Sequence, residues 1–237
     1  MFKIAALEFL LIFFYVLNGA FVSILKPSSS FLQFAFLIPL ALGIFIYIMI
    51  KKNWQKYFFH SINQLYILLP LLFILCIILV SAKGLNLTSM SNVIVMFMLQ
   101  LLTIAFIEET IFRGMMLRML LTKGVATAVW VSSILFGVTH ALQLLGGQSL
   151  EDTILQIIYA LLVGLVLSLL ILDGQSIIVT ILFHGFNNFF NFMGNVESSM
   201  TSAYLIIFVL FVYMFFLWRR VKKGFSLNFM KNAKSTL

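Results

Sequence analysis

The chain has 237 residues, of which 63% are hydrophobic and only 9% are charged, and its mean hydropathy is +1.15. These values exclude a water-soluble globular protein and indicate an integral membrane protein. The net charge of +8 has the sign expected for membrane loops rich in Lys and Arg, so it requires no nucleic-acid partner.

Apolar runs long enough to cross a membrane fill most of the sequence. A helix needs about 20 apolar residues to cross a hydrocarbon core of about 30 Å. The runs are continuous rather than alternating, which favours helices over a β-barrel. The predicted fold is therefore all-α, a polytopic membrane protein with a bundle of about eight transmembrane helices. In chain order these are Ala5–Leu25, Phe31–Ile50, Leu65–Ser81, Val93 to about Ile111, Val125–Leu145, Thr153–Leu172, Ile177–Phe192 and Ala203–Trp218.

Lysine and arginine are unevenly distributed between the two sides of this predicted bundle. Cytoplasmic loops retain basic residues near the helix ends. With the N-terminus in the cytoplasm, only Lys26 and Lys83 fall on the far side. On or toward the cytoplasmic side lie Lys3, Lys51, Lys52, Lys56, Arg113, Arg118, Lys123, Arg219, Arg220, Lys222, Lys223, Lys231 and Lys234. We therefore expect both termini in the cytoplasm. The expected location is the plasma membrane of a bacterium.

Two glutamates and two histidines fall deep within predicted helices, where an ionisable group is costly and usually faces the bundle interior or an aqueous cavity. Glu108 is the midpoint of the helical run 93–123, and His184 is near the centre of its own helix. His140 lies roughly 7 Å farther out, at about 1.5 Å per residue. Helix tilt or a kink near Gly114 can absorb that offset, so these side chains can meet.

Spacings of four residues give these groups neighbours on the same helix face. Glu109 and Arg113 have this spacing, which predicts a charge pair. Glu108 is then the carboxylate without a local partner, although the residues alone leave open which glutamate acts as a base. Two further pairs have the same spacing, namely His184 with Asn188 and Phe136 with His140.

The other polar candidates are expected to be structural. Glu8 lies about a turn and a half from the N-terminal interface, beside Lys3, where a partly hydrated carboxylate costs little. Cys76 is the only cysteine, which excludes a disulfide framework. His60 falls in a predicted cytoplasmic loop.

The residues within the helices suit hydrolysis of a peptide bond. A carboxylate and an imidazole can deprotonate water, while a second imidazole and an amide can stabilise an oxyanion. No serine or cysteine stands in a nucleophile motif, which disfavours a covalent intermediate. Glu108, His140 and His184 are also zinc-ligand types, but no HExxH motif is present. We prefer a mechanism that requires no cofactor and keep zinc as the alternative.

Three motifs carry a resemblance to a known family: EETIFR (108–113) matches EExxxR, FGVTH (136–140) matches FxxxH, and HGFNN (184–188) matches HxxxN. In this order, on successive hydrophobic segments, they resemble the CAAX protease and bacteriocin-processing (CPBP) family of intramembrane proteases. This family includes the type II CAAX prenyl endopeptidases. The resemblance covers about residues 93–192, the expected catalytic core of a single membrane domain that spans residues 1–237.

The resemblance implies roles for these residues. Glu108 and His140 would activate water, and His184 and Asn188 would form an oxyanion hole or, in an older reading of the family, join a metal site. Glu109, Arg113 and Phe136 would support them. The implied protein is a hydrolase, an intramembrane endopeptidase. Its partner would be a membrane-associated substrate, such as a prenylated C-terminal peptide, a pheromone, a bacteriocin precursor or a toxic peptide neutralised in self-immunity.

Two non-protease functions remain as alternatives. A transporter or channel could use Glu108, His140 and His184 as a proton or cation relay. That function predicts charges strung across the depth of the membrane and repeat symmetry, whereas the polar groups here cluster near one level. A non-catalytic membrane scaffold would use the same fold only as a frame, and it should keep its effect when Glu108 is changed to Ala.

Overall fold

Every regular element in the described part of the chain is helical, and no strand occurs there. The structure is a computed structural model that describes residues 2–62, 65–84, 90–192 and 200–235. Its helices are α1 (Phe2–Leu25), α2 (Leu37–Lys51), α3 (Leu69–Lys83), α4 (Met90–Gln100), α5 (Phe106–Glu109), α6 (Leu117–Leu120), α7 (Val125–Thr139), α8 (Leu150–Leu172), α9 (Ile177–Phe192) and α10 (Met200–Ser235). The helices α4, α5 and α6 belong to one continuous helical run. Since the described elements are helical and several are long and apolar enough to cross a membrane, the prediction of an all-α polytopic membrane protein is confirmed.

Within the described residues, five helical stretches are long and apolar enough to cross a membrane, namely Phe2–Leu25, Val93–Lys123, Val125–Gly146, Leu150–Leu172 and Met200–Gly224. The apolar helices α2 and α3 are shorter, with 15 residues each. Both begin later than predicted because each has a proline in its first turn, Pro39 in α2 and Pro70 in α3. Proline is tolerated in the first turn of a helix but not in its interior.

The helical run that carries the two glutamates is not a regular α-helix. Residues Leu101–Ala105 and Thr110–Met116 form two π-helical segments, and the four residues of α5 lie between them. π-helical turns are rare and are frequently found at functional sites. Gly114, where the sequence allowed a kink, falls in the second segment. A Cβ there would lie 3.3 Å from the Ile177 side chain, so this glycine lets the start of α9 approach.

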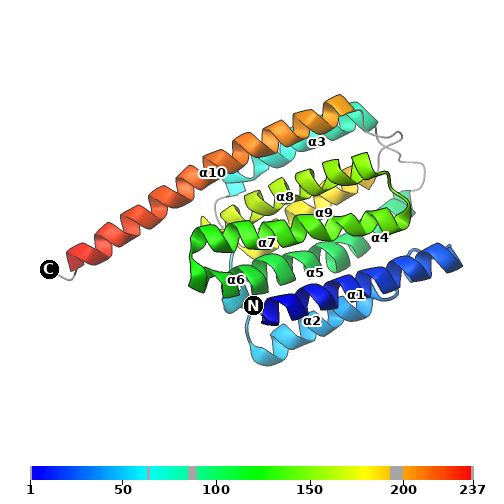
Figure 1. Cartoon of the computed structure of the whole chain (residues 1–237), viewed down its shortest axis with the longest axis horizontal. Helices are drawn as coiled ribbons and strands as arrows, with labels where there is room; N and C mark the ends of the chain where they lie inside the picture. The colour runs from blue at the N-terminus through cyan, green and yellow to red at the C-terminus, as the bar shows by residue number, and fades with distance from the viewer. Residues whose placement is uncertain (1, 63–64, 85–89, 193–199, 236–237) are drawn as a thin grey trace.

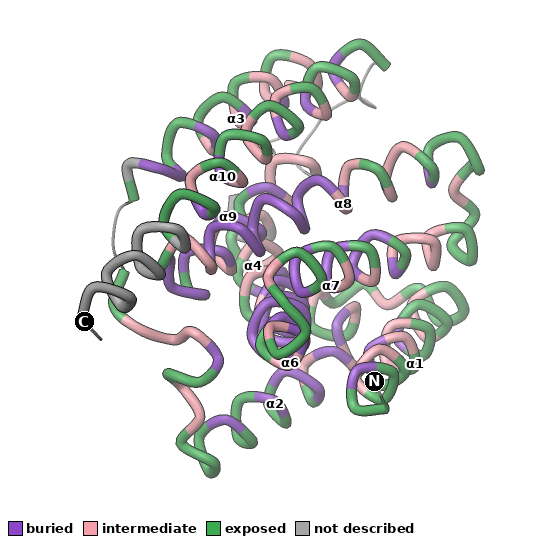
Figure 2. The backbone as a smooth tube through the Cα atoms, turned by 60° about the vertical axis from the view of Figure 1, so that its left-hand side comes forward, coloured by how far each residue is buried: buried purple, intermediate pink, exposed green. Residues whose placement is uncertain are grey.

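The helix α8 forms the centre of the bundle. All its residues from 162 to 171 are buried, and it packs against α7 on one side and α10 on another. Figure 2 shows the buried backbone concentrated in α8, α9 and the run α4–α6. Gly164 permits close packing of α7 on α8, because a Cβ there would lie 3.0 Å from the Cβ of Ser133. Small residues commonly occur where membrane helices approach closely.

The helix α1 lies at the edge of the bundle, beside α2 (Figure 1). Only Ile4, Leu11 and Asn18 of its residues are buried, a single stripe with a spacing of seven residues. Much of its remaining apolar surface is exposed, including Phe9, Phe13 and Leu17, as expected for a helix that contacts lipid. The start of α1 and the end of α10 lie at the same end of the bundle (Figure 1).

Candidate functional site

The imidazole of His184 lies between the two consecutive glutamates. Its Nδ1 is 2.9 Å from Oε1 of Glu109, and its Nε2 is 3.4 Å from Oε2 of Glu108. Since an ionised carboxylate only accepts hydrogen bonds, Nδ1 of His184 carries a proton and donates a hydrogen bond to Glu109. A separation of 3.4 Å exceeds the usual length of an N–H···O bond. Oε2 of Glu108 is therefore buried without a hydrogen-bond partner among the described residues.

A glycine lets the helix that carries this histidine approach the glutamate helix. Gly185 follows His184 in α9, and a Cβ at Gly185 would lie 2.4 Å from Cδ1 of Leu101. Leu101 begins the first π-helical segment. A larger residue at 185 would therefore require either the Leu101 side chain or α9 to move.

Arg113 forms the predicted charge pair with the second glutamate. Its Nη1 lies 3.0 Å from Oε1 of Glu109, and both side chains are fully buried. The guanidinium carbon is 4.0 Å from the centre of the Phe136 ring, a cation–π contact. Gly164 leaves room for this arginine, because a Cβ there would lie 3.3 Å from Nη2. The ion pair and the ring together fix the carboxylate that orients His184.

The ring of Phe136 contacts both site histidines. Its centre lies 5.0 Å from that of His140 and 5.7 Å from that of His184, in edge-to-face geometry. His140 follows the end of α7 and begins a 3₁₀-helical segment, and its Nδ1 lies 2.9 Å from the carbonyl oxygen of Phe136. That bond places the proton on Nδ1 and leaves a lone pair on Nε2. The spacing of four residues in this motif therefore sets both the ring contact and the tautomer.

Two residues of α1 belong to the site although the sequence analysis did not place them there. The Tyr15 hydroxyl donates a hydrogen bond to Oε1 of Glu108 at 2.8 Å. Glu8, expected to be an interfacial carboxylate, lies with Oε1 2.8 Å from the hydroxyl of Thr139, the residue before His140. The available signal was that Glu8 and Tyr15 are polar residues seven positions apart, on one face of an apolar helix.

The two consecutive asparagines of the third motif have different surroundings. Asn188 is half-buried and has no hydrogen-bond partner within the described ranges. Asn187 is buried and accepts a hydrogen bond from the Tyr159 hydroxyl at 2.6 Å. The carboxamide at position 188 is therefore the one that remains available to a ligand.

The donor atoms do not fit the three-ligand zinc alternative. A catalytic zinc site needs three protein ligands around one point. In the described ranges no group of three His, Cys, Asp or Glu side chains is arranged to hold a metal ion. Glu108 and His184 supply one facing pair of donors, but the remaining candidate donor, the Nε2 lone pair of His140, does not complete a three-ligand group with them.

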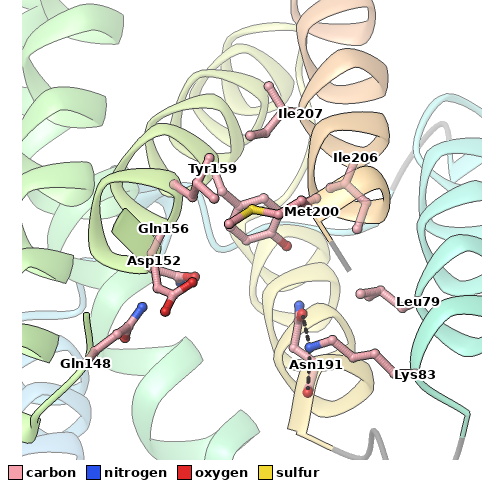
Figure 3. Close-up of a pocket in the computed structure, with 12 residues that line it drawn as sticks. Leu79, Lys83, Gln148, Asp152, Gln156, Tyr159, Asn191, Met200, Ile206 and Ile207 are labelled. Carbon is pink, nitrogen blue, oxygen red and sulfur yellow. Dashed lines mark hydrogen bonds between the residues drawn. The ribbon is translucent and has the colours of Figure 1, made fainter. Parts of the chain in front are cut away.

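A polar hollow of about 340 Å³ lies among α3, α8, α9 and α10 and is separate from this cluster (Figure 3). Lys83 points from α3 to Asn191, and its Nζ lies 3.3 Å from the carbonyl oxygen and 3.4 Å from Oδ1 of that residue. Asn191 in turn donates to the carbonyl oxygen of Asn187 at 3.0 Å. Polar contacts therefore extend along α9 to within one turn of His184, but none of the predicted site residues lines the hollow.

The fold and the site define a polytopic helical membrane protein with buried glutamate, histidine and arginine side chains gathered at one point. Residues 90–190 match the sequence model of the family described as type II CAAX prenyl endopeptidase Rce1-like. This segment, less than half of the chain, contains all three motifs, and the match confirms the resemblance to the CAAX protease family. The family is one of proteases, which supports a peptidase in general. No curated protein and no solved structure matches the chain.

Proposed function

We propose that the protein is an intramembrane endopeptidase that hydrolyses a peptide bond through water activated by Glu108. The observation that carries this proposal is the state of that carboxylate. One oxygen accepts a hydrogen bond from Tyr15, and the other is buried beside His184 without a partner. A buried carboxylate oxygen without a hydrogen bond is costly, so this position favours a bound water molecule.

In the proposed reaction Glu108 takes a proton from water while the water oxygen attacks the carbonyl carbon of the peptide bond. His140, with its free lone pair on Nε2, orients the water. The oxyanion of the tetrahedral intermediate accepts hydrogen bonds from the Asn188 carboxamide and from Nε2–H of His184 in its doubly protonated form. Glu108 then gives its proton to the leaving nitrogen, and the C–N bond breaks to yield a carboxylate and an amine.

The remaining site residues position the reacting groups. Glu109 holds Nδ1 of His184, and Arg113 balances the charge of Glu109. Phe136 packs against Arg113 and both histidines. Such a support matters because an error of about 1 Å in the placement of catalytic groups can reduce a rate about 100-fold.

The proposed substrate is a peptide or protein that enters from the bilayer or its surface, in peptide or bacteriocin processing or in self-immunity. The proposed location is the plasma membrane of a bacterium, with both termini in the cytoplasm. The common end of α1 and α10 (Figure 1) supports this orientation, since basic residues at that end favour the cytoplasmic side.

Cleavage of a mixture of membrane peptides by the purified protein in detergent, followed by mass spectrometry, tests the proposal. We expect products from the wild type and none from Glu108→Gln or His140→Ala. Glu151→Gln, at the exposed start of α8, is the matched control and should cleave normally. Equal product formation by folded Glu108→Gln protein would rule out the assigned role.

A further inference from the structure

A groove of about 790 Å³ lies between α1, α2 and the end of the central run. One wall is a stripe of α1 with helical spacing, formed by Lys3, Ala6, Leu7, Leu10 and Phe14. The facing walls include Leu40, Gly43 and Ile44 of α2 and Ile111, Met115 and Met119 of the central run. The groove is open along one side, because Leu10 and Gly43 are exposed. An apolar groove that opens toward the hydrocarbon of a bilayer is accessible to lipid chains.

The charged residues of the groove are all cationic. Lys3, Lys56 and Arg118 line it, and no acidic residue does. All three are exposed, and among the described residues none of them forms an ion pair with a carboxylate. Burial and the neighbouring Tyr47 raise the pKa of Tyr57, a lining residue, to about 12, so this hydroxyl stays neutral and adds no negative charge beside the cations. The part of the groove formed by Lys3, Lys56 and Arg118 therefore has the charge that complements an anion.

The length of the groove corresponds to one leaflet of a bilayer. From Lys3 to Phe14 the helix rises about 16 Å, at about 1.5 Å per residue. This is close to half of a hydrocarbon core of about 30 Å. Apart from Lys3, Tyr47, Lys56, Tyr57 and Arg118, the side chains that line the groove offer no hydrogen-bonding group. A peptide lying there would leave its backbone groups unsatisfied, whereas an acyl chain has none to satisfy.

We propose that this groove binds one anionic phospholipid from the leaflet at the basic end of the bundle. Its phosphate contacts Lys3, Lys56 and Arg118, and one acyl chain lies along Leu10 and Phe14. The other face of α1 carries Tyr15, which bonds Glu108. A lipid wedged between α1 and α2 therefore holds α1, a helix with few buried residues, in the position that completes the site. Lipid binding itself does not depend on the proposed peptidase activity.

Native mass spectrometry of the full-length protein in detergent with equal amounts of phosphatidylglycerol and phosphatidylcholine tests the headgroup contacts. We expect the wild type to retain one phosphatidylglycerol in preference to phosphatidylcholine. The triple variant Lys3→Gln, Lys56→Gln, Arg118→Gln should lose that preference. The control Lys51→Gln, Lys52→Gln, Lys123→Gln removes the same charge from exposed residues outside the groove and should keep it. An equal loss in both triple variants would mean diffuse charge attraction and would overturn the proposal.

A second variant tests the acyl-chain position without changing any charge. Gly43 lines the groove and faces open space, so Gly43→Phe places a ring where the chain would lie. Gly19→Phe also enters open space, but outside the groove, and is the control. We expect Gly43→Phe alone to lose the bound phosphatidylglycerol while it unfolds at the wild-type temperature. Unchanged lipid retention in Gly43→Phe would refute the proposal, and an accompanying rise in KM for a cleaved peptide would assign the groove to the peptide instead.

Discussion

The Tyr15 hydroxyl donates a hydrogen bond to the Glu108 carboxylate across 2.8 Å, which joins the first helix to a residue 93 positions later. Tyr15 lies outside the segment 90–190 that matches the family. The site is therefore completed by a part of the chain that the three motifs do not cover. Oε1 of Glu108 therefore accepts a hydrogen bond from Tyr15, whereas Oε2 has no hydrogen-bond partner among the described residues.

Loss of this hydrogen bond should slow peptide cleavage. Tyr15→Phe removes the donor and keeps the ring, and hydrogen bonds to charged groups contribute about 1.5–3 kcal/mol. We expect kcat to fall about tenfold or more, since about 1.4 kcal/mol corresponds to a factor of ten. Tyr204→Phe, at an exposed position of α10, is the control. Steady-state kinetics in which both variants match the wild type would show that Tyr15 has no part in positioning Glu108.

Removal of the buried arginine should destabilise the protein strongly. Arg113→Met leaves Glu109 charged and buried without its cation, a change that typically costs about 3–5 kcal/mol. The double variant Glu109→Gln, Arg113→Met should recover part of this stability, because it removes both charges. Thermal unfolding in detergent measures the effect. The more exposed pair of Asp173 and Arg220 gives the comparison, since Asp173→Asn should cost about 1 kcal/mol or less. An equal loss in both cases would contradict the burial argument.

A methyl group at position 185 should displace His184. Gly185→Ala places a Cβ 2.4 Å from Cδ1 of Leu101, so the leucine side chain or α9 must move. We expect reduced kcat in Gly185→Ala and recovery in the double variant Gly185→Ala, Leu101→Ala, which removes the obstructing methyl groups. Gly19→Ala, which meets nothing within 4 Å, should be neutral or slightly stabilising. Failure of the double variant to recover activity would place the cause elsewhere.

Loss of the central ring should affect both histidines together. Phe136→Leu keeps an apolar side chain but removes the cation–π contact with Arg113 and the ring contacts with His140 and His184. We expect a loss of about 1–2 kcal/mol in stability and a larger relative loss in kcat than in KM. Phe208→Leu, at an exposed position of α10, should change neither. A change in KM alone would indicate that Phe136 contacts the substrate rather than the catalytic groups.

The spacing rules of helices explain why much of the site could be predicted from the sequence. Glu109 and Arg113 are four residues apart on one run, so their ion pair follows from helix geometry alone. The same holds for the contact of Phe136 with His140. The eight helical segments of the described residues, with α4–α6 counted as one run, could also be predicted. A backbone that crosses a membrane must form its hydrogen bonds internally, so a continuous apolar run in the sequence indicates a helix.

Contacts between helices distant in sequence could not be predicted in this way. Nothing local to Glu8 or Tyr15 indicates that α1 packs beside Thr139 and Glu108. The bond from His184 to Glu109 depends on how far α9 approaches the central run, which no spacing within one helix encodes. The late starts of α2 and α3, by contrast, follow from prolines that were visible in the sequence.

The two π-helical segments on either side of α5 affect the direction in which Glu108 and Glu109 point from the helix axis. A π turn closes its hydrogen bonds one residue later than an α turn, so each segment accommodates one additional residue. Each residue of an α-helix corresponds to about 100° of rotation and about 1.5 Å of rise. Deleting one residue from Leu101–Ala105 would therefore shorten the run only slightly, but it would rotate Glu108 and Glu109 away from α9 relative to the preceding helix. The orientation of the acidic pair is thus encoded by the number of residues in the helix as well as by their chemical identity.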